Sequence, residues 1–141
     1  MILVDTNVVS ELRKIGAGKA APGVTAWSQS VEASQLYISA ISIMELEMGV
    51  RRLERRDAPQ GKRLRSWFED QVLPEFSART LVVDTAVARC CAGMHVPDRR
   101  SERDALIAAT AHVHGMSVAT RNIADFEPTG IDLIDPWAFA A

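Results

Sequence analysis

The sequence predicts an α/β domain built on a mostly parallel sheet. Short apolar runs alternate with stretches of helical period along the whole chain, which is the pattern of successive strand–helix units. A length of 141 residues with 48% hydrophobic residues suits one globular domain spanning residues 1–141. No repeat or low-complexity segment interrupts this pattern.

Each expected element follows from its own residues. Strands are expected at 2–4, 36–39, 81–83, 117–119 and 131–134. Helices are expected at about 7–13, 24–31, 42–56, 61–76, from Asp84 to just before Pro97, and at 101–114. The run Ala58-Pro59-Gln60-Gly61 separates the third helix from the fourth, and Gly115 is a suitable C-terminal cap of the last helix.

Several protein classes are excluded by composition. No apolar run reaches the roughly 18 to 20 residues that span a bilayer, and Asp5 interrupts any apolar core of a signal peptide. Cys90 and Cys91 are adjacent, which is poor geometry for a disulfide and is not a metal-ligand spacing. We therefore expect a cytoplasmic protein with no membrane association.

The charge distribution is uneven. The net charge of −2 gives no overall positive field of the kind that marks many nucleic-acid binders. Between Arg51 and Arg65, however, seven basic residues face only two acids. Arginine suits bidentate phosphate contacts, although a GC-rich genome would favour arginine as well.

Four acidic residues fall where a strand ends or a helix begins, namely Asp5, Glu45, Asp104 and Asp125. Ligands of open α/β sheets bind at this edge. Asp5 directly follows the first strand, and Thr6 and Asn7 are capping residues too. Three in a row exceed what one helix start needs, which favours a functional role for Asp5.

Helix capping competes with function at two of the other acids. Ser42 and Glu45 have the spacing of a capping box, in which the third helical residue bonds back to the N-cap, and Ser101 with Asp104 is a weaker version. Local pattern alone leaves both explanations open. Asp104 begins "DALIAATA", which has almost no polar face and predicts burial against the sheet, so this acid needs a partner.

Asp125 and the remaining polar residues are equally ambiguous in isolation. In "SVATRNIADF", Thr120 and Asn122 supply a hydroxyl and an amide near Asp125, but turn chemistry explains Asn and Asp as well. The histidines, His95, His112 and His114, are expected to be structural.

One face of the third expected helix, 42–56, contains an acid and, farther along, two basic residues. Glu45, Gly49, Arg52 and Arg56 share one helical stripe. The two arginines either form a solvated face at a helix C-terminus or bind the phosphates of a nucleic acid.

Acids gathered at one edge repel one another. Two unit charges about 4 Å apart repel by roughly 4 kcal/mol at an effective dielectric constant near 20. Either some of the acids are protonated, or a divalent cation lies among them. Oxygen ligands without Cys or His favour Mg²⁺ or Mn²⁺ over zinc, and such ions bridge to substrate phosphates. The pattern therefore indicates phosphodiester chemistry.

Four segments together resemble the PIN-domain ribonucleases, in particular the VapC and FitB-like toxins of prokaryotic toxin–antitoxin pairs. They are "ILVDTNVVSEL", "SAISIMELEMGV", "DALIAATAHVHG" and "VATRNIADF", in the order and spacing of that family. The resemblance implies a three-layer α/β/α sandwich. It also implies that the four acids are the catalytic and metal-binding quartet, supported by Thr120 and Asn122 and by Thr6 and Asn7 beside the first acid.

The resemblance further implies Mg²⁺- or Mn²⁺-dependent cleavage within RNA, with transfer RNA a common target of such toxins. It implies a homodimer that is silenced by a VapB- or FitA-like antitoxin. The alternative is a catalytically silent PIN-like binding module whose acidic pocket docks an arginine-bearing peptide. A haloacid-dehalogenase-like phosphatase is disfavoured because Asn7 stands where that class has a second acid.

Overall fold

A sheet of five parallel strands runs through the centre of the molecule. The structure is a computed structural model that describes residues 1–140. The strands are β1 (Ile2–Val4), β2 (Leu36–Ser39), β3 (Thr80–Leu81), β4 (Ser117–Ala119) and β5 (Leu133–Ile134). They lie in the order β3-β2-β1-β4-β5 with every pairing parallel, which confirms the expected sheet.

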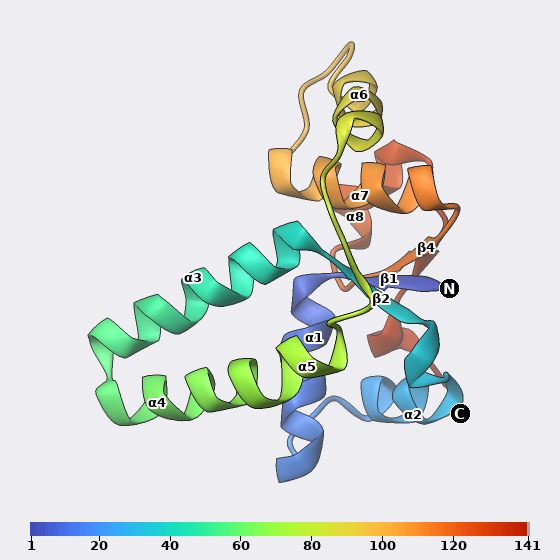
Figure 1. Ribbon diagram of the computed structural model, residues 1–141. Coiled ribbons are helices and arrows are strands. Elements are labelled where there is room, and N and C mark those ends of the chain that lie inside the picture. Colours follow the sequence, from blue (N-terminus) through green and yellow to red (C-terminus); the bar gives the residue numbers. More distant parts are fainter. Residues whose placement is uncertain (141) are drawn as a thin grey trace.

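Helices cover both faces of the sheet (Figure 1). They are α1 (Thr6–Arg13), α2 (Pro22–Ser30), α3 (Ala40–Arg56), α4 (Ala58–Trp67), α5 (Leu73–Glu75), α6 (Thr85–Met94), α7 (Glu102–His114) and α8 (Ile123–Phe126). Successive side chains of a strand point to opposite faces. Val4 accordingly belongs to a core with Trp27 of α2, and Leu3 to a second core with Ile107 of α7. The three-layer arrangement is confirmed.

Two strands are shorter than the sequence predicts. Val82 and Val83 were expected in a strand but are 63% and 38% exposed. The last pair of β3 with β2 joins Leu81 to Ser39, and β2 ends there because α3 begins at Ala40. The following residues therefore have no strand beside them. The final strand likewise covers only Leu133–Ile134.

The long helix α3 begins earlier than expected. Its N-cap is Ser39, whose hydroxyl accepts a hydrogen bond from the backbone N–H of Ile41 at 3.0 Å. Of the two explanations left open for Ser42 and Glu45, the capping box is therefore wrong, because both residues lie inside the helix. Their side chains are left available for contacts outside α3.

The expected break at 58–61 is also wrong, since α4 begins at Ala58. The only residue between α3 and α4 is Asp57, whose carboxylate accepts from the Gln60 N–H at 3.1 Å and caps α4. Pro59 is tolerated because the first turn of a helix has no intrahelical partner for its backbone N–H groups. Past α4, a π-helical turn at Phe68–Val72 leads into α5, where Pro74 has no N–H to donate.

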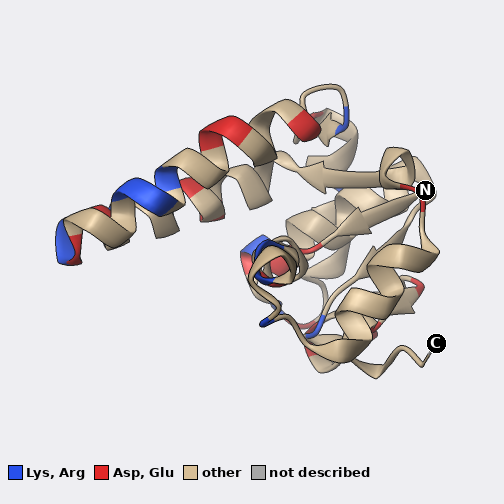
Figure 2. Cartoon of the chain, turned by 90° about the horizontal axis from the view of Figure 1, so that it is seen from below, with Lys and Arg blue, Asp and Glu red and all other residues tan. Residues whose placement is uncertain are grey.

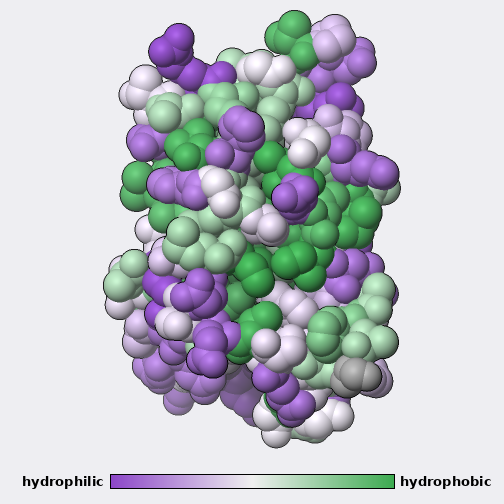
Figure 3. All heavy atoms as spheres, turned by 90° about the vertical axis from the view of Figure 1, so that its right-hand side faces the viewer, coloured by the Kyte–Doolittle hydropathy of each residue, from purple (hydrophilic) through white to green (hydrophobic). Residues whose placement is uncertain are grey.

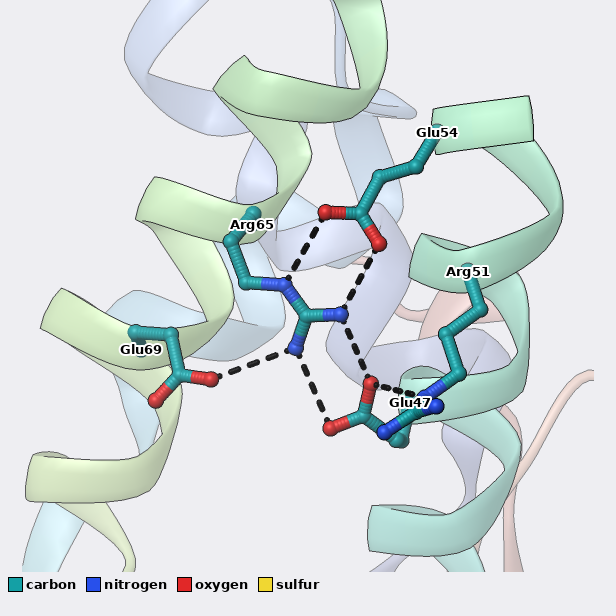
Figure 4. A network of polar contacts seen from close by, with 5 residues as sticks. All are labelled: Glu47, Arg51, Glu54, Arg65 and Glu69. Carbon is teal, nitrogen blue, oxygen red and sulfur yellow. Dashed lines mark hydrogen bonds and ion pairs between the residues drawn. The ribbon is translucent and has the colours of Figure 1, made fainter. Parts of the chain in front are cut away.

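α3 and α4 form a hairpin that projects from the sheet (Figure 1), and Arg65 fastens its two helices together (Figure 4). The Arg65 guanidinium contacts Glu47 at 2.8 and 3.1 Å, Glu54 at 2.9 and 3.3 Å, and Glu69 at 3.2 Å. Planar guanidinium and carboxylate groups match in such paired contacts. The hairpin is thus held in one geometry by charge as well as by packing.

Charge is distributed unevenly over the surface. In the hairpin, basic residues gather toward the outer end and acidic residues toward the sheet (Figure 2). The opposite side of the molecule, at the right of Figure 1, presents apolar side chains interspersed with polar ones (Figure 3). Within residues 1–140, no helix is both long and apolar enough to cross a membrane.

Gly61 provides a test of how closely the hairpin packs. A Cβ at this position would lie 2.5 Å from the Cα of Glu54. Although Gly→Ala normally stabilises a helix, we expect Gly61→Ala to lower the free energy of unfolding by about 1 to 3 kcal/mol through overpacking. Urea denaturation measures the change. Gly93→Ala in α6 is the matched control, because its Cβ would meet nothing within 4 Å. Equal stability of the two variants would contradict this packing.

Candidate active site

Asp5 lies at the end of the central strand and is only 4% exposed. One carboxylate oxygen accepts from the backbone N–H of Thr6 at 2.8 Å, so Asp5 caps α1. The other accepts from the hydroxyl of Thr120 at 2.8 Å and from the amide of Asn7 at 3.3 Å. Asp5 is therefore both a helix cap and a fixed, buried acid.

Thr6 joins Asp5 to the second acid of the site. Its hydroxyl donates to Glu45 at 2.7 Å, and its oxygen lies 2.9 Å from that of Ser42, which is completely buried. Glu45 and Ser42 occupy successive turns of α3, so α1 and α3 meet through these side chains. Sequence reasoning treated Ser42 as a cap and missed this contact. The capping-box spacing between Ser42 and Glu45 was the only local pattern in the sequence that marked Ser42.

Asp104 is the third residue of α7 and is half-buried. The residue before it, Arg103, makes an ion pair with Glu45 at 3.6 Å. No sequence pattern singled out Arg103, since only the crossing of α3 and α7 brings it to the site. The expected cap is formed only in part, because Ser101 is the N-cap residue but makes no side-chain cap bond.

Asp125 lies at the exposed rim, in α8. Thr120 was expected beside it but instead turns its hydroxyl to Asp5 and accepts from the N–H of Asn122 at 3.0 Å. Asn122 is exposed and its side chain does not cap α8. Asn7 accepts from the N–H of Arg121 at 3.3 Å, which ties α1 to this loop.

Neighbouring acids raise the pKa values of Asp5 and Asp104 electrostatically. Burial raises the pKa of Asp5 to about 6, with smaller increases from the charges of Asp104 and Glu45, while the bonds from Thr120 and Thr6 oppose the rise. Burial, then the charges of Asp125 and Glu45, also raise the pKa of Asp104. Asp5 is therefore influenced by Asp104 and Glu45, and Asp104 by Asp125 and Glu45.

The donor set fits a hard cation that keeps some of its water. It consists of carboxylate, hydroxyl and amide oxygens, and the mutual repulsion of the acids favours a positive charge among them. Within the described residues, no three His, Cys, Asp or Glu side chains are close enough to ligate one ion together. Mg²⁺ is commonly held by one or two carboxylates, with waters completing its shell.

Other notable features lie away from this site. A hollow of about 460 Å³ between α1, α2 and the helical segment around Trp67 has a mainly apolar lining and contains none of the four acids. The ring nitrogen Nδ1 of His95 accepts from the N–H of Arg100 at 3.0 Å, which agrees with a structural role for that histidine. Cys90 and Cys91 are free thiols.

Fold and site together define a parallel α/β protein with acidic side chains near the carboxyl edge of its sheet. Residues 2–128 match the PIN domain family, and the chain belongs to that family. It is 38% identical to the VapC ribonuclease Y4jK of Sinorhizobium fredii over 145 residues, covering 97% of this chain and 98% of that protein.

Two further relatives come from Neisseria gonorrhoeae. Toxin FitB is 34% identical over 143 residues, covering 97% of this chain and 99% of the toxin. The crystal structure of FitAcB superposes with a TM-score of 0.88 at 33% identity, covering 99% of this chain and all of that one. Sequence and fold agree over nearly the whole length of the chain.

The raised pKa of Asp5 makes stability depend on pH. Between about pH 4 and 6 the folded protein keeps a proton that the unfolded chain has lost, so ionisation of Asp5 destabilises the fold as pH rises through this window. In EDTA at pH 7, Asp5→Asn should therefore raise the free energy of unfolding, by up to about 3 kcal/mol for two pKa units. Urea denaturation at pH 4 and pH 7 measures this. A gain equally large at pH 4 would contradict the explanation.

Proposed function

We propose that this chain is the toxin of a toxin–antitoxin pair and a divalent-metal-dependent endoribonuclease, which hydrolyses phosphodiester bonds of RNA in the cytoplasm. The observation that supports the proposal is that Asp5, Glu45, Asp104 and Asp125, from four separate segments, interact electrostatically in pairs near the carboxyl edge of the sheet. Relatives named as a VapC ribonuclease and a FitB toxin, similar over nearly their whole length, support it.

The four acids would hold Mg²⁺ or Mn²⁺, directly or through waters. When bound, such an ion supplies positive charge to the scissile phosphate and acidifies the attacking water. Asp5 is the residue best prepared to be a ligand, because two hydrogen bonds at 2.8 Å fix its orientation. The Thr6 hydroxyl fixes one oxygen of Glu45 in the same way.

Two groups near the acids have supporting roles. Thr120 orients Asp5, and its own position is fixed by the N–H of Asn122. Arg103 partly neutralises Glu45 and is 47% exposed, so its guanidinium is within reach of a phosphate entering the site. A phosphate there would contact the guanidinium of Arg103 in the first turn of α7.

A protein partner is part of the proposal. The partner is a VapB- or FitA-like antitoxin, because relatives include a toxin and a solved FitAcB structure. The acidic side chains near the sheet edge would attract a basic segment of such an antitoxin. We further propose a homodimer, which sedimentation of the purified chain tests.

Replacing Asp104 by Asn tests the catalytic assignment. We expect RNA cleavage to fall at least about a hundredfold, as in other losses of transition-state charge stabilisation, with an unchanged circular dichroism spectrum. The assay follows bulk transfer RNA and mixed-sequence single-stranded RNA with Mn²⁺ or EDTA. Asp132→Asn, an exposed acid before β5, is the control and should keep full activity. Cleavage by Asp104→Asn at the wild-type rate would refute the assignment.

Metal binding is tested without RNA. Mn²⁺ at about 100 times its Kd should add roughly 2.7 kcal/mol of stability and raise the Tm of the wild type. The double variant Asp5→Asn/Asp104→Asn should show no such rise. The silent binding module predicts no rise in either protein and no metal-dependent cleavage, so the two assays together separate it from the nuclease.

A further inference from the structure

The stripe of α3 that contains Glu45 faces away from α4. Glu47 and Glu54 both contact Arg65 of α4, which fixes the orientation of α3 (Figure 4). At 3.6 residues per turn, Glu45, Gly49, Arg52 and Arg56 lie about 180° around the helix from those glutamates. The stripe therefore forms an outer face of the hairpin that starts at the acidic site and continues toward the tip.

Gly49 has no packing reason to be glycine. Within residues 1–140, a Cβ at this position would meet nothing within 4 Å. Glycine inside a helix destabilises it by roughly 0.5 to 1 kcal/mol relative to alanine. Gly61, by contrast, is required by the 2.5 Å approach to Glu54. The open space over Gly49 permits a ligand to come close to the backbone of α3 between Glu45 and the arginines.

Arg52 and Arg56 are available cations. Both are exposed, and within the described chain neither forms an ion pair or a side-chain hydrogen bond. Two other arginines of the hairpin are paired: Arg65 with its three glutamates, and Arg51 with Glu47 at 3.0 Å. The commitment of Arg65 also neutralises the acids on the inner face.

We propose that this stripe is the path along which the RNA backbone leaves the acidic site, with Gly49 giving clearance and Arg52 and Arg56 binding phosphates. The proposal rests on the proposed ribonuclease function. At about 1.5 Å per residue, the arginines lie roughly 10 and 16 Å along the axis from Glu45, within a few nucleotides of the scissile bond. Guanidinium groups bind phosphates in a bidentate manner.

RNA suits the stripe better than a protein partner does. The four residues of the stripe are an acid, a bare backbone position and two spaced cations, and none of the four is apolar. Protein interfaces depend on buried aromatic or aliphatic anchors, whereas a nucleic-acid backbone binds through spaced cations.

The first test compares two double variants of equal charge change. Arg52→Ala/Arg56→Ala should raise the KM for mixed-sequence single-stranded RNA roughly tenfold with kcat within about twofold of wild type. Loss of two phosphate contacts should also lower the slope of log affinity against log salt by about 1.4, at roughly 0.7 per phosphate of a single strand. Arg55→Ala/Arg63→Ala, on other faces of the hairpin, should leave KM and slope near wild type.

The second test places a side chain in the open space over Gly49. Gly49→Leu should raise KM several-fold while leaving the Tm unchanged or higher, because leucine favours helices and the position has space. Gly93→Leu is the control, since its surroundings are equally open but lie in α6. Its KM should be that of wild type.

The outcomes separate this path from the proposed function. Wild-type cleavage that Asp104→Asn abolishes, with equal KM for both arginine pairs and for both glycine variants, overturns the path and leaves the nuclease intact. Absence of cleavage by wild type overturns the nuclease itself. Dissociation of a dimer by Gly49→Leu, seen in sedimentation, would assign the clearance to a second copy and also overturn the path.

Discussion

The burial of Asp5 at the end of the central strand, with a smaller repulsion from neighbouring acids, is the constraint on which the rest of the site depends. Burial and neighbouring acids raise the pKa of Asp5 to about 6, so at neutral pH its ionised form opposes folding. Hydrogen bonds from Thr6 and Thr120 offset part of that cost and fix the carboxylate in place. A bound cation would remove most of the remainder. The destabilising effect of ionised Asp5 and the proposed binding of a cation thus have the same physical origin.

The parallel sheet explains why the acids converge. Each strand of a parallel sheet ends at the same edge, so residues distant in sequence arrive there together. The most central strand, β1, delivers the most buried acid, Asp5, whereas Asp125 reaches the rim through an exposed loop and helix α8. The graded burial of the four acids therefore follows from strand order and from the lengths of the connections.

The α3–α4 hairpin has paired charges on its inner face and exposed arginines on its outer face. Arg65 contacts Glu47, Glu54 and Glu69 on the inner face, which fixes the hairpin. On the outer face, Arg52 and Arg56 have no ion-pair partner among residues 1–140. A chain with a net charge of −2 thereby presents a local positive surface near an acidic site. Net charge says little here because the distribution of charge is decided by which side chains pair.

Local patterns in the sequence determined the fold class, most helices and strands, and the positions of the four acids. Apolar runs of strand length and caps such as Asp84 and Gly115 act over a few residues, so they can be read without tertiary contacts. Tertiary structure alone decided the partners of the acids. Ser42 has the spacing of a cap but serves as a buried contact of Thr6, and Arg103 reaches Glu45 only because α3 and α7 cross. Contacts between distant segments depend on how helices pack across a sheet, and no local spacing encodes that.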